Sequence, residues 1–244
     1  MRDAGNKGEY YTPRAVTQLM TKMTNPTLGE KVLDPSAGTG GFLTEAIDHV
    51  REHYVRTVKD EHVLQNSITG WELKPVAYVL GLTNLILHEI DIPDYVYRDS
   101  LKTEYNGISA KDKVDVILAN PPFGASIADG VETNFPASYR CKESADLFVI
   151  LMLQLLKPNG RCAIVLPDGS ITGDGVKARI REKLLTDCNV HTIIRLPQTT
   201  FFPATVSTNL IFFTKGEKTK DIWYYEHQLP EGQKSYSKRK PIQF

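Results

Sequence analysis

Short apolar runs rich in β-branched residues alternate along the chain with longer segments whose apolar positions recur at helical spacing. The short runs predict buried strands, and the longer segments predict amphipathic helices. The expected strands cover residues 31–34, 67–72, 95–98, 114–119, 161–166, 191–196 and 209–214, and the expected helices cover 42–53, 75–88, 145–156 and 176–185. This alternation predicts an α/β fold in which helices cover both faces of a parallel sheet.

Three segments interrupt these patterns. Lys-Pro-Asn-Gly at 157–160 predicts the end of a helix followed by a turn. Residues 215–220 form a solvated charged turn, and residues 124–141 are polar and without a clear period. A loop as long as 124–141 is uncommon unless it is functional or disordered. It is therefore either a plain surface loop or a loop that contacts substrate, with both readings left open.

The composition is typical of one globular domain: 244 residues, 41% hydrophobic, with a formal net charge of +0. A strongly cationic nucleic-acid wrapper is excluded, although a neutral chain can contact DNA through one local face. No apolar run is long enough to span a bilayer, and the first residues lack the apolar core of a signal peptide. The three widely spaced cysteines indicate no disulfide framework or zinc site, so we expect a reducing cytoplasm.

A glycine-rich turn follows the first expected strand, where glycines let the backbone approach a ligand closely. It lacks the Gly-Lys-Ser/Thr of a phosphate loop and the full G-x-G-x-x-G fingerprint. Glu72 ends the second strand, where an acid can accept hydrogen bonds from ribose hydroxyls, or is simply an exposed strand-end acid. Asp99 ends the third strand and either binds an exocyclic amine or caps a turn. The candidate residues of the turn are Asp34, Ser36, Ala37, Gly38, Thr39, Gly40, Gly41 and Phe42.

Asn120, Pro121, Pro122 and Phe123 come directly after the apolar run at 114–119, and the two prolines must end that strand. Ligands in open α/β sheets bind outside the carboxyl ends of the strands. The sequence therefore predicts a site here, at which a planar amino group is held.

These motifs together resemble the S-adenosylmethionine-dependent methyltransferases, and residues 120–123 resemble the catalytic motif of their amino-methylating branch. Residues 8–14 before the glycine-rich turn, the late segment 197–202 and the strand 208–215 narrow the resemblance to the modification (M) subunit of type I restriction–modification systems. That family implies a Rossmann-like sheet, mostly parallel with an antiparallel late strand. It also implies methyl transfer from S-adenosylmethionine to N6 of adenine in DNA, which protects host DNA, together with partner specificity and restriction subunits.

The resemblance also implies roles for individual residues. The Asn120 side-chain carbonyl and the Pro121 backbone carbonyl would accept the two N–H groups of the target amine. Pro122 would fix the backbone, and Phe123 would stack on an adenine flipped out of the duplex. The residues expected to bind the cofactor are Glu9, Tyr10, Tyr11, Thr12, Pro13 and Arg14, the glycine-rich turn from Asp34 to Phe42 without Pro35, Glu72, Asp99 and Asn120.

The resemblance places the helix start at Asp146, Leu147 and Phe148 near the bound bases, although core packing is the alternative for Tyr10, Tyr11 and Phe148. We expect residues 1–216 to form the catalytic domain, with 1–30 as a cofactor-contacting segment. Residues 217–244 would form an extension that continues in a longer protein, and the DNA target sequence would be read by a separate subunit.

Two other functions stay open: a methyltransferase that acts on a protein glutamine or on RNA, and a cofactor-binding scaffold without turnover. No metal is expected, because His49 and His53 lack a third ligand. Ser36 has no nucleophile elbow or histidine partner. The basic residues Lys234, Lys238, Arg239 and Lys240 either contact phosphates or form a solvated terminus.

Overall fold

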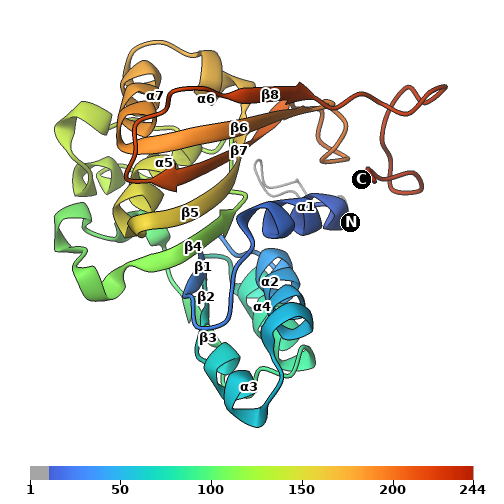
Figure 1. Ribbon diagram of the computed structural model, residues 1–244. Coiled ribbons are helices and arrows are strands. Elements are labelled where there is room, and N and C mark those ends of the chain that lie inside the picture. Colours follow the sequence, from blue (N-terminus) through green and yellow to red (C-terminus); the bar gives the residue numbers. More distant parts are fainter. Residues whose placement is uncertain (1–10, 244) are drawn as a thin grey trace.

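The computed structural model describes residues 11–243, and Figure 1 shows their strands gathered in one twisted sheet flanked by helices. The sheet has eight strands in the order β3-β2-β1-β4-β5-β7-β6-β8. The strands are β1 (Val32–Asp34), β2 (Ile68–Glu72), β3 (Asp94–Tyr97), β4 (Val114–Ala119), β5 (Leu156–Pro167), β6 (Cys188–Leu196), β7 (Thr208–Lys215) and β8 (Trp223–Glu226).

Strand direction confirms the expected mostly parallel sheet. The pairs β1–β2, β1–β4, β2–β3, β4–β5 and β6–β8 are parallel, whereas β7 runs antiparallel to both β5 and β6. Because β7 alone is reversed, the carboxyl ends of the other strands lie along one edge of the sheet. The candidate residues that follow β1, β2, β3 and β4 therefore meet at that edge.

Helices cover both faces of the sheet, as Figure 1 shows, with α1, α2 and α4 on one side and α5 and α7 on the other. The α-helices are α1 (Arg14–Thr24), α2 (Gly41–Tyr54), α3 (Val58–Gln65), α4 (Pro75–Leu87), α5 (Ser144–Leu155), α6 (Asp168–Thr172) and α7 (Val176–Asp187). Short 3₁₀ helices lie at η1 (Ser100–Lys102), η2 (Tyr105–Gly107), η3 (Ala110–Asp112), η4 (Val131–Asn134) and η5 (Ala137–Tyr139).

The structure adds elements to those expected. Helices α1, α3 and α6 and strand β8 were not predicted, and η4 and η5 lie in the loop 124–141. The turn at 157–160 lies inside β5 as a large bulge, because Leu156 pairs with Val114 while Arg161 pairs with Val116. Asn159 adopts φ 64° there, so the chain does turn locally even though the strand continues. Helix α5 ends at Leu155, just before this bulge, as the sequence predicts.

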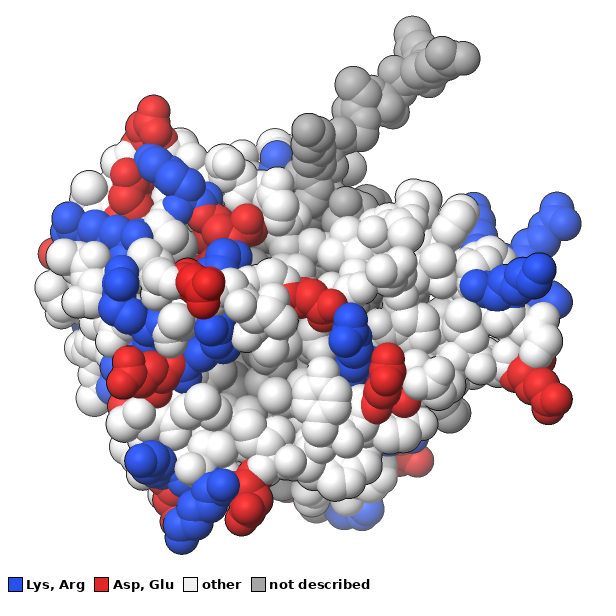
Figure 2. Space-filling model, turned by 90° about the horizontal axis from the view of Figure 1, so that it is seen from above, with Lys and Arg blue, Asp and Glu red and all other residues white. Residues whose placement is uncertain are grey.

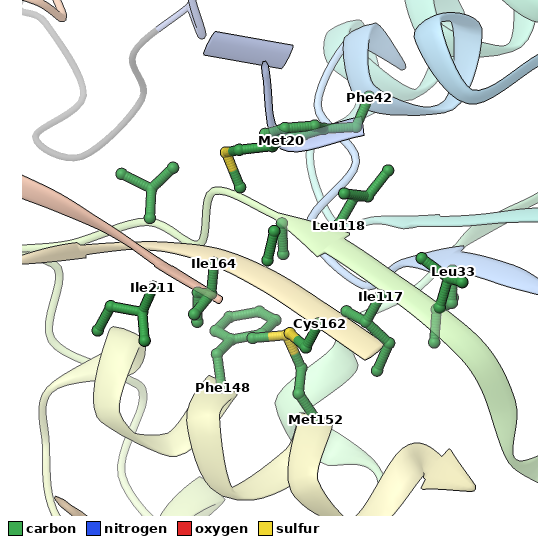
Figure 3. Close-up of a cluster of buried hydrophobic side chains, with 14 of the residues drawn as sticks. Met20, Leu33, Phe42, Ile117, Leu118, Phe148, Met152, Cys162, Ile164 and Ile211 are labelled. Carbon is green, nitrogen blue, oxygen red and sulfur yellow. The ribbon is translucent and has the colours of Figure 1, made fainter. Parts of the chain in front are cut away.

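The core lies on both faces of the central strands. Figure 3 shows Phe148 and Met152 of α5 packed towards Cys162 from one side, and Met20 and Phe42 on the other side of the sheet. Strand β4 is deeply enclosed, since its residues 116–119 are fully buried. Asn120 therefore follows directly from a strand that is packed on both faces.

Candidate functional site

A cavity of about 530 Å³ opens at the carboxyl edge of the sheet. Its wall is built from the ends of β1, β2, β3 and β4, from the segment before α1 and from the loop after β4. The expected site residues that line it are Tyr11, Thr12, Asp34, Ser36, Ala37, Gly38, Thr39, Gly41, Phe42, Glu72, Asp99, Asn120 and Pro122. Segments more than one hundred residues apart in the chain are thus brought to one cavity.

Other expected residues take different positions. Pro13, Arg14, Gly40, Pro121 and Phe123 are not part of the cavity wall. Pro13 and Arg14 begin α1, and Gly40 adopts φ 81° immediately before α2. Glu9 and Tyr10 lie outside the described residues.

The glycine-rich turn is tied to the neighbouring strands through Gly38. Its N–H donates to Glu72 Oε2 at 2.8 Å, and its carbonyl accepts from the Tyr95 hydroxyl at 2.8 Å. Gly38 adopts φ 59°, which is a left-handed backbone conformation. This conformation is unfavourable for any L-residue that has a Cβ atom. This conformation and these two bonds fix how the turn faces the cavity.

The two acids that end β2 and β3 have different partners. Glu72 is buried, and its second carboxylate oxygen accepts the Lys74 N–H at 2.6 Å, so the alternative of an exposed strand-end acid is wrong. Asp99 accepts the Leu101 N–H at 3.1 Å, which makes it the cap of η1 while it also faces the cavity. One oxygen of Asp99 thus has a structural role.

Asp34 is 1% exposed at the end of β1, and its Oδ1 accepts the Ser36 N–H at 2.9 Å. Burial raises the pKa of the Asp34 carboxyl to about 8, and the negative charge of Glu72 raises it further, whereas the hydrogen bond from Ser36 lowers it. At pH 7 this carboxyl is therefore mostly protonated, so the cavity wall carries a neutral acid at the end of β1.

The Asn120 side chain is oriented by one bond and leaves one acceptor open. Its Nδ2 donates to Thr12 Oγ1 at 3.0 Å, across 108 positions of the chain. Its Oδ1 is buried and accepts no hydrogen bond from the described residues. A buried acceptor without a partner costs about 1–3 kcal/mol. Such a cost is typical of a site that a ligand donor satisfies.

The residues after Asn120 are held from two sides. The Ser144 hydroxyl at the start of α5 donates to the Pro122 carbonyl. The Phe123 ring is 5% exposed and meets Phe201, from the segment after β6, edge to face at a centroid distance of 6.4 Å. The late segment 197–202 thus reaches residues 120–123.

The structure shows where Tyr11 and Phe148 lie, for which core packing and a place at the site were the alternatives. Tyr11 is 73% exposed at the cavity mouth, so core packing is wrong for it. Phe148 is buried in the core and also touches the cavity wall. Asp146 beside it is buried and pairs with Lys177 at 3.0 Å.

Sequence reasoning missed several cavity residues. The Arg98 guanidinium lies 4.3 Å from the Trp71 ring centroid, and both side chains line the cavity. Residues 125–128 and Val131 of the long loop form a further wall. The available signal was that Trp71 and Arg98 lie at the carboxyl ends of β2 and β3, and that the loop begins soon after β4. Of the two readings left open for this loop, the structure therefore places part of it against the site.

Within residues 11–243, no three His, Cys, Asp or Glu side chains come together in a way that could hold a metal ion. The His53 ring instead bonds to the His49 carbonyl and stacks on the His49 ring. Nor does the same part of the chain contain a helix long and apolar enough to cross a membrane.

Comparison with known proteins identifies the family. A family model described as N-6 DNA methylase matches the chain over residues 1–244. The chain belongs to this family. The resemblance inferred from the motifs is thereby confirmed, and with it the mostly parallel sheet with a reversed late strand.

Several relatives of this N-6 DNA methylase chain are type I restriction proteins. It is 49% identical to the type I restriction enzyme EcoEI methylase subunit of Escherichia coli, over 100% of the chain and 50% of that protein. It superposes on a modification subunit of a putative type I restriction enzyme from Vibrio vulnificus YJ016 with a TM-score of 0.93 and 45% identity, covering 98% of this chain and 51% of that one. The chain thus spans about half the length of these relatives.

A more distant structure shares only the fold with this chain. It is a putative class I S-adenosylmethionine-dependent methyltransferase from Listeria monocytogenes, with a TM-score of 0.69 and 18% identity over 92% of this chain and 68% of that one. The cavity has features that fit S-adenosylmethionine: its glycine-rich turn offers close backbone approach, and the acid Glu72 lies beside that turn.

Proposed function

We propose that this chain carries the methyl-transfer site of a type I modification subunit and transfers a methyl group from S-adenosylmethionine to N6 of adenine in DNA. The observation that carries the proposal is the open, buried Oδ1 of Asn120 beside a cavity of cofactor size. An exocyclic amine has two N–H groups and suits such an acceptor.

The residues of this chain would position the reactants. S-adenosylmethionine, when bound, supplies a methyl group activated by its sulfonium. Thr12 holds the Asn120 amide so that Oδ1 faces the amine, and that oxygen stabilises the positive charge that develops on nitrogen. The Pro121 carbonyl is proposed as the second acceptor, and the bond from Ser144 to the next carbonyl steadies its direction.

The cofactor would be held by the glycine-rich turn, Glu72 and Asp99, with Thr12 and Tyr11 near its methyl end. We propose Phe123 as the surface on which the flipped adenine stacks, which requires the ring to become more accessible than its 5% exposure in this structure. We assign catalysis to residues 1–216, and β8 from the extension 217–244 adds an edge strand to the same sheet.

Specificity and restriction subunits are the proposed partners, and the cytoplasm, where DNA is available, is the proposed location. Figure 2 shows Lys and Arg interspersed with Asp and Glu on the visible face, without a continuous basic surface. The formal net charge of the chain is +0. Non-specific DNA affinity comes mainly from neutralised phosphates, so much of the DNA contact would fall to a partner.

The test is product analysis with three substrates. The protein, together with its proposed specificity subunit, is incubated with labelled S-adenosylmethionine and with DNA, release factor or RNA. We expect N6-methyladenine in DNA, identified by mass spectrometry. Label in release factor or RNA and none in DNA would overturn the substrate, and cofactor binding without any transfer would reduce the chain to a scaffold.

A further inference from the structure

Helix α4 carries a second apolar face that points away from the sheet. Residues 75–87 contain no charged side chain, and Val76, Val79, Leu80, Ile86 and Leu87 are 52–75% exposed. A surface helix normally turns charged or polar residues outwards, and a helix that is apolar all round is normally buried. The outer face of α4 is therefore built to be covered.

The helix cannot rotate to hide this face within the described chain. A Cβ added at Gly81 would lie 2.3 Å from the Tyr95 hydroxyl oxygen, so the inner face sits directly on β3. Asn84 Nδ2 also donates to the Thr39 carbonyl at 3.1 Å. These contacts fix the rotation of α4 and leave the second face outside.

The spacing of the exposed side chains indicates what covers them. Val76, Val79, Thr83 and Ile86 follow the alternating steps of three and four that a packed partner helix requires, and Leu80 and Leu87 widen the stripe. The absence of charge argues against phosphates or an acidic partner. The occupant that fits is an apolar helix.

The area of the face decides whether that helix can come from a separate molecule or must belong to the same polypeptide. A helix of 13 residues is about 20 Å long and presents a stripe about 10 Å wide, roughly 200 Å². A stable complex of free proteins needs about 800 Å² per partner, so a second copy or a separate subunit would not be held by this stripe alone. A segment of the same polypeptide docks at a much higher effective concentration. The relatives have about twice the length of the region they share with this chain.

We propose that the outer face of α4 binds an apolar helix that belongs to the other half of the type I modification polypeptide. The face then joins the methyl-transfer domain to the rest of the subunit. The proposal does not depend on which base or macromolecule the site methylates.

The test compares this chain alone with a chimera in which it replaces the aligned half of the E. coli EcoEI methylase subunit. Hydrogen exchange of residues 75–87 is expected to slow by at least about tenfold in the chimera. The double substitution Val79→Glu with Leu80→Glu should abolish that slowing and lower the melting temperature of the chimera, while leaving that of the chain alone unchanged. Leu185→Glu, on an exposed apolar site of α7, is the matched control and should change neither.

Equal exchange at 75–87 in the two proteins would overturn the proposal. So would a double variant that destabilises both proteins equally, because the effect would then be internal to the domain. Light scattering of the chain alone decides the remaining case: a dimer that the double substitution dissolves would make a second copy the occupant and contradict the proposal.

Discussion

The buried carboxyl of Asp34 should make the stability of the protein depend on pH in a defined window. Its pKa is about 8 in the folded protein, against about 3.9 in an unfolded chain. Between these values the folded state binds more protons than the unfolded state. The contribution of this group is therefore complete below about pH 4 and is lost as the pH rises to about 8.

The magnitude follows from the same two values. Each unit of pKa difference corresponds to about 1.4 kcal/mol, so the loss between pH 4 and pH 8 amounts to roughly 5 kcal/mol. Asp34→Asn removes the titration. Its amide oxygen can still accept the Ser36 N–H. The stability of the variant relative to the wild type should thus rise by about 1.4 kcal/mol per pH unit from pH 5 to pH 8 and then level off.

Urea unfolding at pH 5, 6, 7, 8 and 9 measures this difference directly. Asp221→Asn removes one carboxyl at an exposed position and serves as the control. Parallel stability curves for Asp34→Asn and the wild type would refute the reasoning, because they would mean that Asp34 titrates alike in the folded and unfolded states.

Three further substitutions test the architecture of the site. Tyr95→Phe removes the hydrogen bond to the Gly38 carbonyl. It should lower the free energy of unfolding by about 1 kcal/mol, measured by urea titration, and weaken cofactor binding, measured by calorimetry. Unchanged values would show that this bond does not hold the turn. In Gly38→Ala the added Cβ meets no atom within 4 Å, so a loss of about 1–2 kcal/mol in the free energy of unfolding should come from φ 59° alone. The control Gly107→Ala, at ordinary backbone geometry, should lose much less in the same urea titration. Phe201→Ala should cost about 3–5 kcal/mol and slow methyl transfer by releasing Phe123; a stable variant of normal rate would contradict that coupling.

Much of the fold could be predicted because its strands are short, apolar and regularly separated. The strand at 114–119 and the helix after 144 are almost entirely buried and produce strong signals. Helix α3 was missed because it buries only Leu64, although the capping box at Thr57 and Asp60 marks its start. Strand β8 was missed because all four of its residues are exposed and it pairs only at the sheet edge.

The candidate site was predictable where it depends on strand ends and less so where it depends on tertiary contacts. Glu72 ends β2 and Asn120 directly follows β4, and ligands in open α/β sheets bind at the carboxyl ends of the strands, so the sequence brings the two residues together. The contact of Asn120 with Thr12 joins positions 108 residues apart, so local sequence does not carry it. For Asp99 the sequence left binding and capping open, and the local backbone path shows that it caps η1. The sequence also gave no indication that Phe201 would meet Phe123.

The most direct test of the central claim is the rate of adenine methylation by Asn120→Ala, measured beside its affinity for S-adenosylmethionine. Trp71 lies in the cavity wall and reports binding by fluorescence once Trp223→Phe removes the other tryptophan. Loss of the open acceptor should lower kcat by about 10²–10³-fold, with the Kd for the cofactor nearly unchanged, while Asn66→Ala at an exposed helix end should leave both as in the wild type. A rate for Asn120→Ala within about tenfold of the wild type would contradict the account, because the buried Oδ1 would then not hold the target amine.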